Sequence, residues 1–448
     1  MLSPQQAQDR ALALIERARR CGADASDAVY IADLSESVQV RLGKLEDVER
    51  SESEHVGLRV FVGRRSASIG STDLSDSALD ELAARAVAMA RAAPEDPYAG
   101  LAPEDRLMRG PLPELDIADP ADPSPQDLRA IAEATEDAAR AVDGVTNSEG
   151  GGASAGRSVI ALATSHGFAG GYSGTSRSLS ASVIAGEGEN MQRDYGWRSA
   201  RYAADLPGAE EIGTLAGTRA VARLNPGKLK SGPMPVVFDP RVGGSLVGHL
   251  VGAMAGSSIA RRSSFLLDRL EEQLFDSALC IIDDPHRPRG PRSRPFDGEG
   301  LPTMRRALVE GGRLTGWLME SASARQLGLA PTGHASRGSS GAPGVSATNL
   351  HLEAGTVSPA ELMSDIADGV YVTELIGHGV NGVTGDYSRG ASGVRIVNGQ
   401  LAGPVAEFTV AGNLLEMFRG LTPANDLEWH RPINVPTIRV DGLTVAGD

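Results

Sequence analysis

The chain has 448 residues, of which 41% are hydrophobic and 23% charged, a composition typical of a globular protein. A net charge of −15 and the lack of a long basic run argue against a nucleic-acid-binding surface, because phosphates are bound by clustered Lys and Arg. Two distant cysteines, Cys21 and Cys280, form neither a disulfide framework nor a CxxC metal site, and the first twenty residues lack the apolar core of a signal peptide. We therefore expect a cytoplasmic protein.

Residues 1–100 show the pattern of an N-terminal α+β domain. Ser3-Pro4 predicts the start of a helix that extends to Gly22. Alternating apolar residues and short turns then predict an antiparallel meander, and a second helix is expected over 75–93. The meander strands are expected at 27–33, 37–43, 56–63 and 65–71. Residues 101–125, rich in proline and acidic side chains, predict a linker.

Residues 126–230 predict a middle α+β region, with helices over 126–142 and 208–223 on either side of strand-rich sequence. Within it, GASAG (152–156) has the spacing of a nucleophile motif, but no helix pattern follows, so we interpret it as a loop. Residues 231–448 predict a strand-rich C-terminal domain, with a buried strand over 233–240, hairpin turns at 310–312 and 398–399, and an amphipathic helix over 263–275. The fold class is therefore α+β, with helix and antiparallel-sheet units followed by a strand-rich domain that carries a glycine-rich helix.

That glycine-rich helix, predicted over 241–261, contains a single histidine, His249. Glycine recurs at every fourth position and would form a bare stripe on one helix face, at a cost of roughly 1 kcal/mol per Gly relative to Ala. The stripe consists of Gly244, Gly248, Gly252 and Gly256. A zinc-protease helix needs two ligands one turn apart, yet the residues four positions from His249 are Ser245 and Ala253. The stretch is too rich in Gly and Ser for a membrane helix, and we expect no membrane span.

Other candidate residues lie in turns. GHGVNG (377–382) follows a strand but does not open a helix, so a dinucleotide site is not favoured. His334 and His378 lie in glycine-rich loops, where functional groups tend to gather. Four acidic residues could bind a hard cation, although their spacing favours ordinary acidic turns. These are Asp283, Asp284, Asp297 and Glu299.

Several stretches together closely resemble the TldD/PmbA family, and its PmbA branch, also called TldE, more than its TldD branch. They include RRSSFLLDRL (261–270), the block 294–329, TGHASRG (332–338), VTELIGHGVNGVTGDYSRGASG (372–393) and AEFTVAGNLLEMFR (406–419). The resemblance is dense in the C-terminal half and looser in the N-terminal half. It implies one half of a heterodimeric, cytoplasmic zinc metalloprotease that degrades unfolded peptides and matures peptide precursors.

In that family, TldD-type chains carry an HExxxH motif on the helix after a VVFDP-like strand, and a distant cysteine ligand. Placed on this chain, the motif positions hold Gly248, His249 and Ala253, and no cysteine follows Cys280. The resemblance therefore implies a non-catalytic subunit without a metal of its own, with zinc in a TldD-type partner. The loops 332–338 and 377–393 would help shape a peptide cleft. The candidate peptide-binding or partner-binding residues are His334, His378, Asp386, Tyr387, Ser388 and Arg389.

Two alternatives stay open at this point. The chain could be an autonomous metallohydrolase with an unrecognised site, for which His334, His378 and the carboxylates of Asp283, Asp284 or Asp386 are conceivable ligands. It could also be a non-proteolytic binding protein in a toxin–antitoxin or gyrase pathway. When alone, the chain could form a homodimer.

Overall fold

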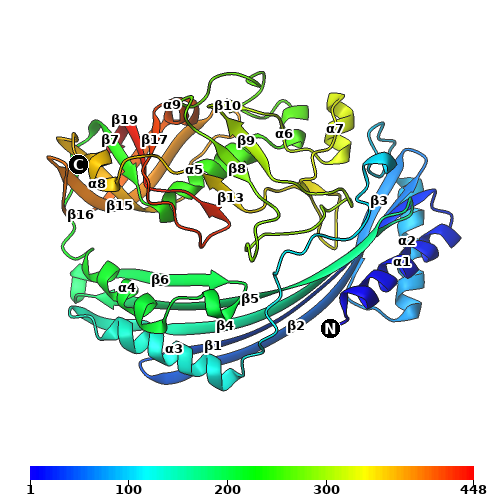
Figure 1. The fold of residues 1–448 in the computed structure, drawn as a ribbon, viewed down its shortest axis with the longest axis horizontal. Coiled ribbons are helices and arrows are strands. Elements are labelled where there is room, and N and C mark those ends of the chain that lie inside the picture. Colours follow the sequence, from blue (N-terminus) through cyan, green and yellow to red (C-terminus); the bar gives the residue numbers. More distant parts are fainter.

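A single long, curved sheet runs through the first half of the chain (Figure 1). The computed structural model describes all residues from 1 to 448. The sheet has the strand order β3-β2-β1-β4-β5-β6, and every neighbouring pair is antiparallel. Its strands are β1 (Ala25–Arg41), β2 (Lys44–Val62), β3 (Arg65–Ser71), β4 (Val145–Thr164), β5 (Ala169–Ala185) and β6 (Gln192–Ala200). Strands from residues 1–100 and from 126–230 therefore share one sheet.

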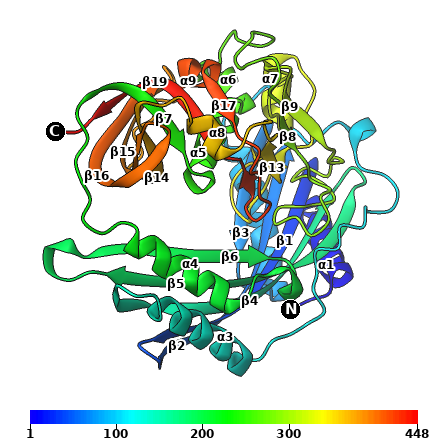
Figure 2. The same ribbon diagram turned by 60° about the vertical axis from the view of Figure 1, so that its left-hand side comes forward.

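Four helices cover one face of this sheet, and the C-terminal half of the chain lies across the other face (Figures 1 and 2). The alternation along β1 explains the two layers. Ala28 and Tyr30 are buried among the helices, whereas Val29 between them packs with Phe296 of the C-terminal half. The helices are α1 (Pro4–Arg20), α2 (Asp76–Ala92), α3 (Pro125–Arg140) and α4 (Ala209–Val221), with short 3-10 turns η1 (Glu104–Arg106), η2 (Gly188–Asn190) and η3 (Ala203–Asp205).

The C-terminal half is built around a small barrel. Its strand order is β16-β15-β14-β7-β19-β17, and β16 also pairs with β19, which closes the sheet on itself. Only β7 and β14 are parallel neighbours there. These strands are β7 (Gly232–Phe238), β14 (Asp368–Ile376), β15 (Asp386–Val397), β16 (Gln400–Asn413), β17 (Leu421–Pro423) and β19 (Ile438–Ala446), with α8 (Pro359–Met363) and α9 (Leu414–Arg419) beside them.

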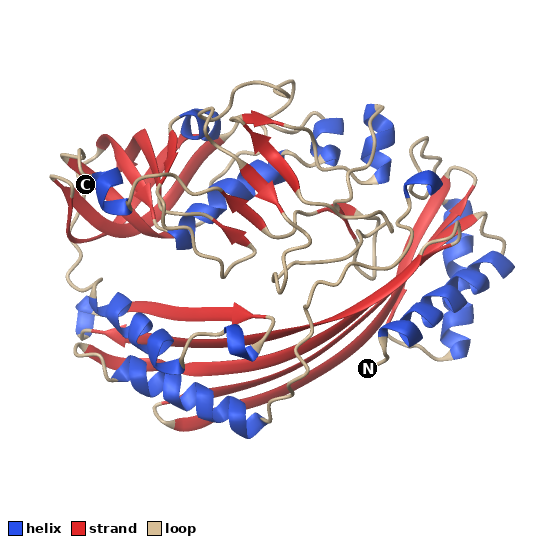
Figure 3. Ribbon diagram, viewed as in Figure 1, coloured by secondary structure: helices blue, strands red, loops and turns tan.

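A second, five-stranded sheet of short strands, with the order β10-β9-β8-β13-β18, completes the C-terminal half. Loops and turns make up much of the chain around it (Figure 3). The largest buried apolar cluster, of 41 residues, fills the space within this half. Its remaining elements are α5 (Pro240–Ala253), α6 (Gly256–Ala260), α7 (Ser321–Leu327), β8 (Ile281–Asp283), β9 (Arg306–Glu310), β10 (Arg313–Leu314), β13 (Leu350–Leu352) and β18 (Ile433–Asn434), and the small pair β11 (Ala335–Ser336) and β12 (Gly344–Val345). None of the helices combines the length and hydropathy needed to span a bilayer.

A buried network of charges joins the long sheet to the C-terminal half. Asp27 on β1 accepts hydrogen bonds from Arg59 on β2, whose Nε lies 2.8 Å from Oδ2, and from Arg337 of a C-terminal loop. Arg59 also faces Glu299, 3.5 Å away. All four side chains are at most 7% exposed, so each charge depends on the others for the interactions that water would otherwise supply.

The α+β fold class is confirmed, as are the four N-terminal and middle helices and both hairpin turns. Three details are wrong. The strands predicted at 27–33 and 37–43 are one strand, because the polar residues Ser35 and Glu36 between them continue the pairing with β2. GASAG is not a loop: it lies inside β4, where Ser154 Oγ is 2.7 Å from Ser178 Oγ of β5.

The domain boundaries predicted at residues 100, 125 and 230 remain predictions.

The third correction concerns 263–275, which forms successive turns and not an amphipathic helix. Positive φ angles at Asp268 and Glu271 break the helical path, and the Phe265 N–H donates to Gly382 of another loop. Four of its six apolar residues are nevertheless buried as expected, namely Phe265, Leu266, Leu274 and Phe275, whereas Leu267 is partly buried and Leu270 is exposed.

Replacing Asp27 by Asn should lower the free energy of unfolding by about 3–5 kcal/mol, because Arg59 and Arg337 would remain buried without their shared carboxylate. Denaturation with urea, followed by tryptophan fluorescence, measures the change. A matched control is Glu36→Gln on the same strand, whose partner Arg50 is 61% exposed and for which we expect a loss of less than about 1 kcal/mol. Equal losses in the two variants would contradict this role of Asp27.

Candidate functional site

The glycine-rich helix is α5, which starts after β7 at the edge of the barrel. Asp239 caps it by accepting from the Arg241 N–H at 2.8 Å, and Pro240 occupies the first turn. The single helix predicted over 241–261 is interrupted. Ala255 is extended, and the Gly256 N–H donates to Leu318 at 2.7 Å, so a neighbouring segment takes the hydrogen bond that would have continued the helix.

The glycine stripe does not pack closely along its whole length. A Cβ added at Gly248 would make only an ordinary contact with Ile433, and one at Gly252 would meet open space. Only Gly256 is crowded, because a Cβ there would overlap Met319 and lie 3.0 Å from the Leu318 carbonyl oxygen. The stripe therefore leaves one side of α5 open near Gly248 and Gly252.

His249 is largely buried on α5, and its Nε2 has no hydrogen-bond partner. Its ring lies 6.3 Å from that of Tyr387 on β15, edge to face, and the Tyr387 hydroxyl is also buried without a partner. Burial, and next the charge of Arg389, lower the pKa of His249, while burial raises the pKa of Tyr387 to about 12. Both side chains are therefore neutral near pH 7.

These residues do not fit a zinc ion. Of the three motif positions, Gly248 and Ala253 have no donor atom, and the only donor, His249, lies close enough to Arg389 for that cation to lower its pKa. The chain contains no group of three or more His, Cys, Asp or Glu side chains that could hold a metal ion.

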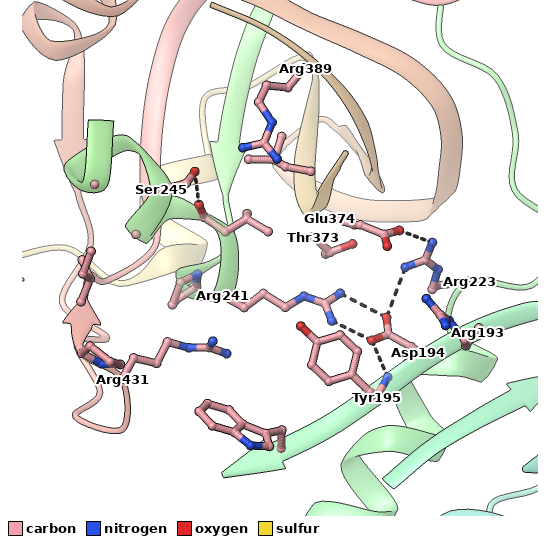
Figure 4. A pocket seen from close by; sticks show the side chains of 18 of the residues that line it. Arg193, Asp194, Tyr195, Arg223, Arg241, Ser245, Thr373, Glu374, Arg389 and Arg431 are labelled. Atoms are coloured by element: carbon pink, nitrogen blue, oxygen red, sulfur yellow. Dashed lines mark hydrogen bonds and ion pairs between the residues drawn. The ribbon is translucent and has the colours of Figure 1, made fainter. Parts of the chain in front are cut away.

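Beside this helix lies a cavity of about 580 Å³, between the long sheet and the barrel (Figure 4). It is lined by β6, α5, β14 and β15, by Arg223 after α4, by Arg292 and by the segment 431–433. Gly244 and Gly248 form part of its wall, so the bare side of α5 provides space in the cavity. Two apolar side chains of β14 and β18, Leu375 and Ile433, line it as well.

Arginine side chains dominate the charge of the cavity wall. Arg241 binds both carboxylate oxygens of Asp194, at 2.8 and 3.2 Å, and Arg223 joins Asp194 to Glu374 (Figure 4). Burial alone would raise the pKa of Asp194, but the hydrogen bond and charge of Arg241 hold it below its usual value. These ion pairs connect β6 with α5 and β14, and so fix the walls of the cavity.

Three further arginines in the cavity wall form no ion pair with a carboxylate: Arg292, Arg389 and Arg431. The Arg389 Nε is buried without a partner. The Arg431 Nε donates to His430 Nε2 at 3.1 Å, which leaves its terminal nitrogens free. Burial, followed by the charge of Arg198, lowers the pKa of His430 to about 4.

The residues predicted from the resemblance fall into two groups. Gly248, His249, Tyr387 and Arg389 lie together, at or behind the cavity wall. His378, Asp386 and Ser388 are exposed in the same β14–β15 segment, and Asp386 there accepts from Thr384 and Asn413.

His334 lies apart from them, buried at 3% exposure, with its Nε2 3.3 Å from Asp283 and its Nδ1 2.9 Å from Thr332. No residue of 332–338 lines the cavity. Two of the candidate acids are satisfied within the protein: Asp297 accepts three backbone N–H groups, and Glu299 accepts from Ser321. Asp283 accepts from Thr348 through Oδ1, whereas its buried Oδ2 has no hydrogen-bond partner. Burial, and next the charge of Glu299, raise the pKa of Asp297 to about 6.

Sequence reasoning missed the arginines as a group. They come from six separate segments between residues 193 and 431, with no local spacing that marks them as one site. Only the tertiary fold, with the ion pair of Arg241 on α5 and Asp194 on β6, brings them to one cavity.

Comparison with known proteins places the chain in a family of peptidases. Models of PmbA/TldA metallopeptidase domain 1, central domain and C-terminal domain match residues 26–90, 118–224 and 231–447. The chain therefore belongs to the PmbA/TldD metallopeptidase family, as the sequence resemblance predicted. It is 40% identical to the metalloprotease PmbA of Escherichia coli O157:H7 over 92% of this chain and 90% of the relative. It is 35% identical to a PmbA homologue of Haemophilus influenzae over 97% and 94%.

Solved structures share the whole fold. A protein of Bacteroides thetaiotaomicron, described as a candidate modulator of DNA gyrase, matches with a TM-score of 0.91 at 26% identity over 100% of both chains. TldE of Thermococcus kodakarensis matches with a TM-score of 0.86 at 20% identity, over 98% of this chain and 100% of that one. At that identity the second match concerns the fold alone.

Gly252→Ala should stabilise the chain by up to about 1 kcal/mol, because alanine favours the helix and its Cβ would point into open space. Gly256→Ala is the matched comparison and should destabilise by about 1–3 kcal/mol through overlap with Met319. Thermal denaturation of the two variants measures both effects. Destabilisation by Gly252→Ala would show that this side of α5 is not open in the isolated chain.

His430→Gln should weaken the acid sensitivity of the chain. The pKa of His430 is lowered to about 4 in the folded state, against about 6.5 when unfolded, so the unfolded state takes up a proton first as the pH falls. Stability is thus lost from about pH 6.5 down to about pH 4, and the variant lacks this loss. Tm measured between pH 7 and 4.5 should fall less for His430→Gln than for the wild type or for the exposed control His378→Gln. Parallel curves for all three would refute the assignment.

Proposed function

We propose that this chain is the non-catalytic, TldE/PmbA-type subunit of a cytoplasmic heterodimeric zinc metalloprotease. Its TldD-type partner carries the zinc, and the assembly degrades unfolded peptides and processes peptide precursors. The observation that carries the proposal is the set of residues on α5: Gly248, His249 and Ala253 stand where two histidine ligands and a glutamate base would be needed.

The electrostatics of α5 support the same proposal. A zinc site needs anionic or neutral donors that converge on the cation, whereas the charge of Arg389 acts on His249, lowers its pKa, and has the same sign as the metal. The named activity of the relative from Escherichia coli is that of a metalloprotease. In this proposal that activity belongs to the pair of subunits, and this chain contributes binding surface and not the hydrolytic centre.

An exposed apolar surface next to α5 supports a protein partner. Ile376 at the end of β14 and Val383 in the segment that joins β14 to β15 are 58% and 57% exposed. That segment lies against the end of α5, because Gly382 accepts from Phe265 and the adjacent Ser264 donates to the Ala253 carbonyl oxygen at 2.7 Å. The open side of Gly252 is at the same end of the helix. A TldD-type subunit is the occupant that we propose for this surface.

Co-expression with a TldD-type chain that contains HExxxH tests the function. We expect a stable one-to-one complex with about one zinc per heterodimer and peptidase activity that a chelator abolishes. The isolated chain should bind far less than one equivalent of zinc and should not cleave the same peptides.

Two variants of the isolated chain make the zinc measurement specific. His249→Ala and His334→Ala each remove one of the imidazoles that a hidden metal site would use, and neither should change the small amount of zinc retained. Stoichiometric zinc on the isolated chain, lost in one of these variants and accompanied by peptide cleavage, would instead establish an autonomous metallohydrolase.

A further inference from the structure

The cavity beside α5 has an excess of positive charge that the protein itself does not balance. Six arginines line it, against the two carboxylates Asp194 and Glu374. Both carboxylates are already paired, Asp194 with Arg241 and Arg223, and Glu374 with Arg223. The chain as a whole has a net charge of −15, whereas the unpaired arginines give this cavity a positive charge.

The unpaired guanidinium groups come from different walls. Arg389 projects from β15 and Arg431 from the segment before β18, on separate sides of the cavity (Figure 4). The buried Nε atoms of Arg389 and Arg241 have no partner within the chain. A buried donor without an acceptor costs free energy. The terminal nitrogens of Arg431 form no hydrogen bond within the chain, and an anionic ligand in the cavity would supply acceptors for such groups.

The remaining features of the cavity favour the carboxylate of an extended peptide over a phosphate. Tyr195, Trp197 and Ile433 provide apolar contact surface, as a peptide requires. In addition, β6 is the last strand of its sheet, so its outer edge pairs with no further strand, and an added chain would replace the side chains of Arg219 and Arg198 as donors to the carbonyl oxygens of Tyr195 and Trp197. An extended chain can align along such an edge.

We infer that this cavity binds the carboxylate groups of an extended peptide, with Arg292, Arg389 and Arg431 as the donors. The inference rests on the proposed function, because it names acidic segments, or a peptide C-terminus, as the preferred substrate class of the assembly. Guanidinium groups suit this role since they bind carboxylates through two parallel hydrogen bonds.

Fluorescence anisotropy with labelled ten-residue peptides tests the inference on the full-length chain. A peptide with four glutamates and a free C-terminus should bind at least tenfold more tightly than its glutamine-substituted, C-terminally amidated counterpart, and added salt should weaken its binding. Two further peptides, each lacking only the side-chain or only the terminal carboxylates, identify the source of the recognised group. Either source supports the inference. Equal binding of the first two peptides would overturn it.

Arg389→Gln and Arg431→Gln should each reduce the affinity for the glutamate peptide by about tenfold or more and leave that for the glutamine peptide unchanged. The matched control is Arg395→Gln on the same strand as Arg389, since Arg395 is exposed and paired with Asp368 outside the cavity. If the cavity variants bind like this control, the inference is wrong. It is also wrong if inorganic phosphate at peptide-like concentrations displaces the glutamate peptide. Thermal denaturation confirms that each variant is folded.

Complex formation separates this inference from the proposed function. Arg389→Gln and Arg431→Gln should still copurify with a TldD-type chain while the preference for acidic peptides is lost. An arginine-dependent acidic preference in a chain that pairs with no such partner would support the cavity assignment and refute the proposed heterodimer.

Discussion

The ion pair between Arg241 and Asp194 determines where the candidate site lies. Arg241 is in the first turn of α5, Asp194 is on the last strand of the long sheet, and both side chains are at most 8% exposed. Such a pair contributes little net stability, because the desolvation of two charges offsets much of their attraction. Breaking it is costly, however, since one charge would remain buried alone. The main effect of the pair is therefore to fix the position of α5 relative to β6. It holds the glycine side of α5 opposite β6, and the space between them is the cavity.

A second buried network, of Asp27, Arg59, Arg337 and Glu299, connects other parts of the same two layers. Together the two networks attach the C-terminal half to the concave side of the sheet at separate places (Figure 1). Apolar packing between the layers is modest by comparison. The cluster that includes Val29, Leu162 and Phe296 has only seven buried residues, whereas the one inside the C-terminal half has 41. Directional charge pairs therefore set the relative placement of layers whose apolar contact is small.

The elements with strong local signals could be predicted from the sequence. Ser3-Pro4 and the apolar periodicity after it predict α1, and Asn398-Gly399 predicts the hairpin between β15 and β16. Elements whose structure depends on contacts with residues distant in the sequence could not be predicted. Residues 44–52 are exposed on both faces of β2, so no alternation marks them as a strand, and their pairing with β1 alone keeps them extended. Residues 263–275 have a helical apolar pattern, yet contacts with the 382 loop and with Gly312 hold them in turns.

The same distinction explains what the sequence revealed of the site. His249 and its small neighbours lie on one helix, so spacing alone showed that no second ligand lies one turn away, and the family resemblance placed the motif positions at Gly248, His249 and Ala253. The arginines could not be grouped in this way, because nothing in the sequence around each one distinguishes it from an arginine on the surface. Only the folded sheet and barrel bring them together at the cavity. The two observations are physically connected. Where a metal site would need converging donors, glycines leave space, and cations line the wall beside it. The positive charge of that wall suits an anionic ligand and does not suit a metal ion. The wall could therefore contribute to catalysis only by positioning a peptide.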